Sequence, residues 1–108
     1  MRLNGPSKRR FDEIFRLGRR VSGTGLRVYS APGSGLMGFT TSKSLGCRAR
    51  RNHLQRKVRE AVGLTSDLPS GYDWIVLLRA EGQKLSFKDL AQEWAQLSSK
   101  ITQQWEGA

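Results

Sequence analysis

The sequence predicts an α+β fold, a single-domain α-β-β-α-β-α sandwich that spans residues 1–108. The length favours this class, because 108 residues can bury one core but are too few for two independent ones. The apolar pattern favours it too, because three segments show helical spacing and three show the spacing of strands. No internal repeat, linker or low-complexity segment interrupts this series.

The first predicted element is a short amphipathic helix. Ser7 is a typical residue for a helix start. Phe11, Ile14 and Phe15 follow at spacings of three and four residues, which places them on one face. Gly18 stands where such a helix commonly ends.

Two strands are predicted next. β-Branched and aromatic residues predominate over residues 25–31 and again over residues 36–41. The residues between them, 32–35, are Pro, Gly, Ser and Gly, which are typical of turns. The sequence therefore predicts a β-hairpin in this region.

A second helix is predicted over residues 49–62, because its apolar residues share one stripe and Gly63 follows as a terminating residue. The stripe consists of Leu54, Val58, Ala61 and Val62. The run from residue 72 to residue 78 is apolar on both alternating faces, which is typical of a central strand covered on both sides.

The last predicted element is a long C-terminal helix. Ser86 to Asp89 match a capping box, the pattern in which a hydroxyl side chain bonds the first turn of a helix. Apolar residues then continue at helical spacing, at Leu90, Trp94, Leu97 and Ile101.

Positive charge is concentrated in the first 60 residues. The chain has 19 Lys and Arg against 9 Asp and Glu, and residues 1–60 hold 15 of those cations and three of those acids. A surface built for solubility alone would mix the signs, so we expect a polyanion-binding face in the first half and a conventional scaffold in the second. Nucleic acid is the leading candidate partner, and a basic surface without a specific ligand is the alternative.

Other classes of protein are disfavoured. The longest uninterrupted apolar run, residues 74–78, is far shorter than the roughly 20 residues that cross a bilayer, and residues 1–10 have no apolar signal core. The single Cys47 has no partner for a disulfide or zinc site, which fits a reducing cytoplasm. His53 is the only histidine, so we expect no catalytic residue and no metal site in the protein itself.

The strongest candidate for a binding site is the segment 43–60, which reads KSLGCRARRNHLQRKVRE. Asn52, Arg56 and Arg59 fall in one narrow helical sector, roughly opposite the apolar stripe. Arg offers planar, bidentate donors to phosphate, so this face suits a phosphate backbone or structured RNA. A charged face that binds only solvent is the alternative.

Aromatic residues in the basic half have two possible roles. Phe11, Phe15 and Tyr29 could pack in the core, which is the usual role of a helical Phe pair. They could instead stack on the bases of single-stranded nucleic acid, which requires an open ring face in a cleft. The residues alone leave both roles open.

Residues 43–60 resemble the arginine-rich signature of the bacterial ribonuclease P protein component. The helix pattern of that family is close to RNxxKRxxRE, and the matching residues here are Arg51, Asn52, Arg56, Arg59 and Glu60. His53 and Gln55 stand at two positions that are usually basic. The resemblance extends over nearly the whole chain, through KRRFDEIFRLGRRVSG, MGFTTSKSLG and GYDWIVLLR.

The resemblance implies a subunit of an endoribonuclease whose large RNA removes the 5′ leader of precursor tRNA, with Mg²⁺ held mainly by that RNA and the substrate. It implies a left-handed βαβ crossover, an exception to the usual handedness. The residues implied to face the catalytic RNA are Lys43, Arg48, Arg51, Asn52, Arg56 and Arg59. The residues implied to line a cleft for the single-stranded leader are Phe11, Phe15 and Tyr29.

The same resemblance implies the partners. They are the catalytic RNA and precursor tRNA, with one protein copy in each particle, and neither DNA nor a membrane. A general RNA-binding or ribosome-associated protein, which would use the same basic helix without supporting a reaction, is the alternative function.

Overall fold

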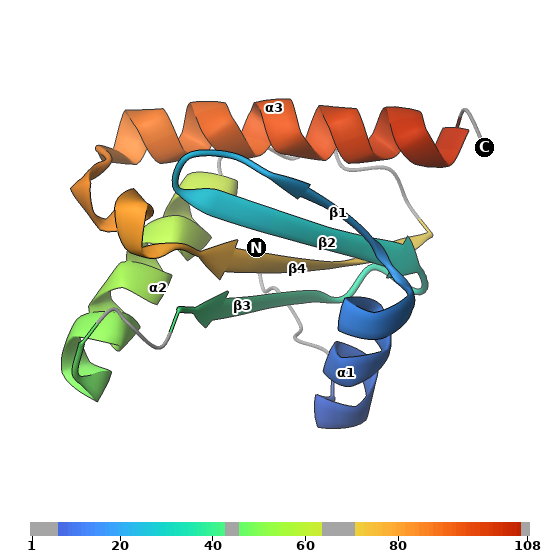
Figure 1. The fold of residues 1–108 in the computed structure, drawn as a ribbon, viewed down its shortest axis with the longest axis horizontal. Helices are drawn as coiled ribbons and strands as arrows, with labels where there is room; N and C mark the ends of the chain where they lie inside the picture. The colour runs from blue at the N-terminus through green and yellow to red at the C-terminus, as the bar shows by residue number, and fades with distance from the viewer. Residues whose placement is uncertain (1–6, 43–45, 64–70, 107–108) are drawn as a thin grey trace.

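A computed structural model describes residues 7–42, 46–63 and 71–106 (Figure 1). In chain order its elements are α1 (Lys8–Leu17), β1 (Arg19–Ser22), β2 (Leu26–Pro32), β3 (Met37–Thr41), α2 (Arg48–Gly63), β4 (Tyr72–Leu78), the 3-10 helix η2 (Ala80–Lys84) and α3 (Phe87–Glu106). The predicted α+β class is confirmed, and these described ranges contain one strand and one 3-10 helix more than the sequence predicted.

Two of the three predicted helices begin with a serine cap. The hydroxyl of Ser7 accepts the backbone N–H of Arg10 at 3.2 Å, and that of Ser86 accepts the backbone N–H of Asp89 at 3.1 Å. These bonds satisfy donors that the first turn of a helix leaves unpaired, so α1 and α3 begin where the sequence predicts.

The four strands form one sheet in the order β1-β2-β4-β3. β4 pairs antiparallel with β2 and parallel with β3, so the predicted central strand is confirmed. The predicted hairpin between residues 25–31 and 36–41 is wrong, because β4 lies between the two strands and they do not pair with each other.

The segment that joins β2 to β3 explains this difference. Its backbone N–H groups at residues 34–36 donate to the Oδ1 of Asp73 in β4, at distances of 2.8 to 3.0 Å. Gly35 has a φ of 99°, in the left-handed region that favours glycine. The turn residues therefore wrap round the start of β4 instead of closing a hairpin.

The strand that sequence analysis missed is β1. It has four residues, and only Val21 among them packs against the core. A segment this short and this polar shows no apolar alternation, so its strand conformation depends on antiparallel pairing with β2.

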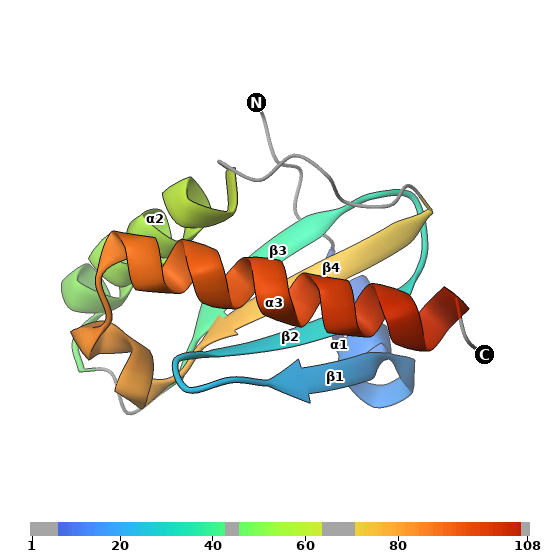
Figure 2. The ribbon, with the colours of Figure 1, turned by 90° about the horizontal axis from the view of Figure 1, so that it is seen from above.

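The helices cover the two faces of the sheet unequally (Figure 2). α2 and α3 pack together on one face, over a core that includes Val58, Trp74 and Trp94. α1 alone covers part of the other face, where Ile14 packs against Ile75. The larger part of the core is therefore on the face away from α1.

β3 and β4 are connected through α2, which lies on the face of the sheet that α3 covers. In Figure 2 both strands run from right to left, with α2 on the viewer's side and β3 above β4. This path is left-handed, as the family resemblance implies. It places the start of α2 beyond the end of β3 (Figure 1).

Candidate nucleic-acid interface

The predicted division of α2 into an apolar and a polar face is confirmed. The four residues of the apolar stripe are buried, whereas four of the predicted RNA contacts are exposed, namely Arg48, Asn52, Arg56 and Arg59. Arg51, a fifth predicted contact, is half-buried at the edge of this surface. Lys43 lies outside the described residues. We call Arg48, Arg51, Asn52, Arg56 and Arg59 the α2 basic face.

Two arginines of the α2 basic face have side-chain donors that the described residues do not use. The Cζ of Arg59 lies 5.3 Å from the centre of the Phe39 ring. The Nε of Arg51 is buried and has no hydrogen-bond partner within the described part of the chain. A buried donor without a partner costs free energy.

Other cations of α2 are used inside the protein. The guanidinium of Arg50 donates to the side chain of Gln83 at 2.5 Å, and the Nζ of Lys57 donates to the backbone carbonyl of Leu85 at 2.7 Å. Both bonds tie α2 to η2 and to the segment that leads into α3. The cations of α2 therefore fall into two groups, one that anchors the helix and one that faces solvent.

The N-terminus of α2 adds to this positive surface. Cys47, directly before the helix, is exposed, and the backbone N–H of Arg50 lowers the pKa of its thiol. A lowered thiol pKa indicates that an anion is stabilised there, because unpaired N–H groups point out of a helix start. The start of α2 therefore favours negative charge.

The three predicted aromatic residues come together on the face of the sheet that α1 covers. The ring of Phe15 lies 4.6 Å from that of Tyr29 at an angle of 80°, and 5.8 Å from that of Phe11. Tyr29 is buried and Phe11 half-buried, but Phe15 is 40% exposed. Tyr29 therefore has mainly a core role, while Phe15 presents a ring to solvent.

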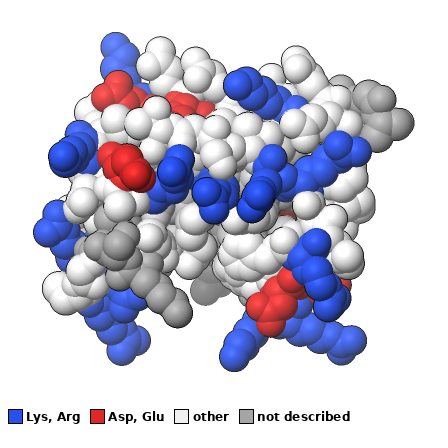
Figure 3. All heavy atoms as spheres, viewed as in Figure 1, with Lys and Arg blue, Asp and Glu red and all other residues white. Residues whose placement is uncertain are grey.

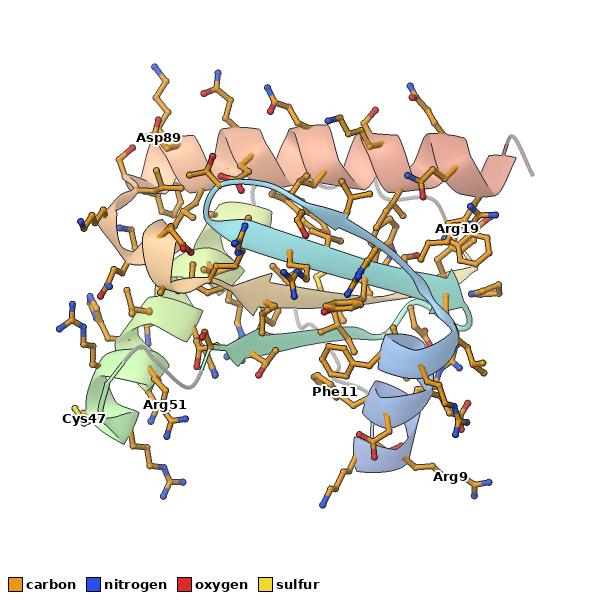
Figure 4. The ribbon with its side chains drawn as sticks, viewed as in Figure 1. Arg9, Phe11, Arg19, Cys47, Arg51 and Asp89 are labelled. Atoms are coloured by element: carbon orange, nitrogen blue, oxygen red, sulfur yellow. The ribbon has the colours of Figure 1, made fainter. Side chains whose placement is uncertain are left out.

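Phe11 and Arg51 point toward the same side of β3. In Figure 4, Phe11 points from α1 into the space below β3, and Arg51 points into the same space from the start of α2. Phe11 and Arg51 therefore approach β3 from two different helices. The aromatic cluster belongs to the core on the α1 side of the sheet, whereas the ring that Arg59 contacts, Phe39, packs against the core on the other side.

Further cations continue from the aromatic cluster toward β1. Arg20 lies directly opposite Tyr29 in the pairing of β1 with β2, and Arg27 precedes Tyr29 by two residues on the same sheet face. Beside Arg27 is a cavity of about 240 Å³, which is also lined by Leu77 and Arg79. A row of Lys and Arg crosses this side of the molecule below α3 (Figure 3).

Arg20 and Arg27 are near the aromatic residues in the sequence, which favours base stacking there. Strand alternation places Arg27 on the face of Tyr29, whereas the position of Arg20 beside Tyr29 depends on the pairing of β1. Sequence analysis did not indicate Arg79 as a site residue.

An ion pair fixes α1 on the sheet. The Nε of Arg10 lies 2.8 Å from the Oδ2 of Asp73, whose side chain is only 2% exposed. The same guanidinium also donates to Glu13 and to the carbonyl of Pro32. Burial raises the pKa of Asp73, but the bonds from Arg10 and from three backbone N–H groups outweigh it, so that the net pKa is lowered.

The described residues do not form a metal-binding cluster. No three His, Cys, Asp or Glu side chains come together in the parts of the chain that the structure covers. Mg²⁺ requires several oxygen ligands, and Asp73 is already saturated by Arg10 and backbone donors. No helix within these same ranges is long and apolar enough to cross a membrane.

A basic α+β domain with one arginine-rich helix face and an aromatic cluster with an exposed ring belongs to the class of nucleic-acid-binding domains. The family comparison is more specific. The model of the Ribonuclease P family matches residues 2–102, and the chain belongs to this family.

Individual relatives agree with this assignment. The chain is 37% identical over 83 residues to the ribonuclease P protein component of Chloroflexus aggregans, covering 73% of this chain and 60% of that protein. It is 34% identical over 59 residues to that of Bartonella quintana, covering 53% of this chain and 44% of that protein. The matches therefore span less than two thirds of both relatives.

The fold is similar to that of a solved family member. The ribonuclease P protein from Thermotoga maritima superposes with a TM-score of 0.77 at 25% identity, covering 93% of this chain and 98% of that one. The predicted fold class is confirmed by this similarity as well as by the strand order.

Proposed function

We propose that this chain is the protein subunit of ribonuclease P, which binds the catalytic RNA and the 5′ leader of precursor tRNA and promotes endonucleolytic removal of the leader. Membership of the family supports the proposal. The observation that carries it is the presence of two surfaces of different chemistry in one small domain, the exposed α2 basic face and an aromatic cluster with the exposed ring of Phe15.

The α2 basic face is the proposed contact with the catalytic RNA. Its arginines present bidentate donors, and Asn52 can both donate and accept a hydrogen bond. The lowered pKa of the Cys47 thiol favours an anion at this end of α2. Lys43, just before this helix in sequence, belongs to the same proposed contact.

The aromatic cluster is the proposed site for the leader. A leader differs in sequence between precursors, so its recognition must tolerate any base, and stacking on an aromatic ring does so. The exposed ring of Phe15 provides a stacking surface, with Phe11 and Tyr29 supporting it. Arg20 and Arg27, next to Tyr29, provide charge for the leader phosphates.

In this proposal the RNA subunit performs the cleavage, and the protein contributes binding and orientation. Mg²⁺ supplies charge neutralisation and activated water in phosphodiester hydrolysis, and it is held mainly by oxygens of the catalytic RNA and substrate. We further propose that a protein monomer acts as one copy per particle in the cytoplasm, without DNA or membrane partners.

Cleavage of a precursor tRNA at low Mg²⁺ concentration tests the proposal. The reaction is run with a bacterial ribonuclease P RNA alone, with this protein alone, and with both together. We expect efficient formation of the mature 5′ end only with both, because the protein cations compensate for the scarcity of Mg²⁺.

A protein that leaves the cleavage rate unchanged would refute the subunit function. Equal affinity for ribosomal RNA and ribonuclease P RNA at matched salt would then identify a general RNA-binding protein.

A further inference from the structure

We propose that Phe39 is a positioning residue of the α2 basic face, which holds the guanidinium of Arg59 in the orientation that an RNA phosphate requires. This inference rests on the proposed RNA-binding function of α2. It adds a residue of β3 that does not itself touch RNA, and that neither the helix pattern nor the charge pattern of the sequence indicates.

The geometry places a cation over an aromatic ring. The Cζ of Arg59 is 5.3 Å from the centroid of Phe39, within the distance of about 6 Å at which a guanidinium is attracted by a ring face. Arg59 is on the solvent side of α2, and Phe39 is half-buried in β3. The contact therefore joins an exposed functional side chain to the sheet beside it.

Phe39 is well fixed. Its backbone pairs with Val76 of β4, and its ring packs against the main hydrophobic core. Because the core holds one side of the ring, the other side of the ring keeps a constant position. The guanidinium above it has fewer orientations than a free arginine side chain.

The donors of Arg59 remain available. Attraction to a ring uses the positive charge of the guanidinium and does not use its N–H groups. Within the described residues, the side chain of Arg59 contacts the Phe39 ring and makes no hydrogen bond or ion pair. Its donors are therefore both oriented and free to bind a phosphate bidentately.

The neighbouring Arg56 is the natural comparison. It is exposed on the same helix face, and no aromatic contact within the described residues holds it. Ordering a long side chain on binding costs free energy, and a side chain ordered beforehand avoids part of that cost. We therefore expect the ring to strengthen RNA binding through Arg59 and not through Arg56.

The test uses Phe39→Leu, which keeps an apolar side chain in the core, and Phe39→Tyr, which keeps the aromatic ring. Each is made in the native chain, in Arg59→Ala and in Arg56→Ala. Affinity for a bacterial ribonuclease P RNA is measured over a series of salt concentrations, and thermal unfolding by circular dichroism identifies variants that fail to fold.

We expect Phe39→Leu to weaken RNA binding about two- to fivefold, the factor that corresponds to one exposed cation–π contact. The salt dependence should stay the same, because the phosphate contact persists. The loss should be absent in Arg59→Ala and fully present in Arg56→Ala. Phe39→Tyr should retain native affinity.

An equal loss in the Arg59→Ala background would overturn the proposal, because Phe39 would then act through the fold alone. Loss of affinity in Phe39→Tyr at unchanged stability would overturn it as well. If Arg59→Ala itself leaves RNA affinity unchanged, the positioning role of Phe39 is refuted. The proposed function is tested independently, by whether the native protein stimulates cleavage.

Discussion

Replacement of the buried carboxylate by an amide, in Asp73→Asn, tests how α1 is held on the sheet. The amide keeps the shape and one acceptor oxygen, but it removes the negative charge that faces Arg10 at 2.8 Å. A hydrogen bond between charged groups contributes about 1.5–3 kcal/mol. Complete burial of both partners would raise the cost of breaking the pair to about 3–5 kcal/mol.

The structure favours the lower range. The Arg10 side chain is 24% exposed and also bonds Glu13, so it keeps water and a second carboxylate after the substitution. We expect a loss of about 2–3 kcal/mol in the free energy of unfolding at neutral pH. For a domain of this size, that corresponds to roughly 10–20 °C in the midpoint of thermal unfolding.

The lowered pKa of Asp73 predicts how the stability difference between the native protein and Asp73→Asn changes with pH. Because the folded-state pKa of Asp73 is below its ordinary value, its contribution is complete above the ordinary pKa and is lost as the pH falls through the folded-state pKa. The difference between native protein and variant should therefore be constant near neutral pH and shrink in acid.

Thermal unfolding followed by circular dichroism from neutral pH to about pH 3 is the assay. Asp12→Asn is the matched control, since Asp12 is an exposed carboxylate of α1, and its midpoint should stay close to native. A neutral-pH loss below about 0.5 kcal/mol, the usual range of surface substitutions, would refute the reasoning. A difference that does not shrink in acid would refute the role of the charge.

Three further predictions concern the proposed RNA surfaces. Arg56→Ala combined with Arg59→Ala should weaken RNA binding and lower the slope of log affinity against log salt by about two. Arg50→Ala, which removes an anchor to Gln83, should change this slope little. An unchanged slope in the double variant would exclude the α2 basic face as the RNA contact. Phe15→Ala should reduce affinity for a precursor with a leader by about 1–3 kcal/mol more than for leaderless tRNA, as a binding titration of both would show; equal losses would indicate damage to the core. Cys47 should react with iodoacetamide at neutral pH faster than a free cysteine, because the pKa of its thiol is lowered. Bound RNA should slow this reaction. Reactivity that RNA does not change would place the RNA away from this end of α2.

The sequence predicts those elements whose signal is local. α1, α2 and α3 have apolar residues at helical spacing, and β4 has the continuous apolar run of a doubly covered strand. The order of the strands is not a local property. β4 separates β2 from β3 because Asp73 of β4 accepts hydrogen bonds from the backbone of the segment that joins those two strands. Ser34, one of the donors, lies 39 residues earlier in the chain. No periodicity within residues 25–41 contains that information.

In the candidate site too, some residues are placed by local periodicity, whereas the role of others depends on distant parts of the chain. Helical periodicity is sufficient to place Asn52, Arg56 and Arg59 on one exposed face. It is insufficient to show that Arg50 and Lys57 are anchors, because their partners lie 33 and 28 residues further along the chain. Burial of Tyr29 likewise depends on α1, which packs over it from an earlier part of the sequence.

The central position of β4 has a consequence for distance. β2 contributes Tyr29 to the aromatic cluster, β3 contributes Phe39 beneath Arg59, and both strands are hydrogen-bonded to β4. Neighbouring strands in a sheet are about 4.8 Å apart, so β2 and β3 are held about 10 Å apart without a hinge between them. The sheet therefore acts as a rigid spacer, which keeps the proposed contact for the catalytic RNA, beside β3, at a constant distance from the proposed leader site, beside β2.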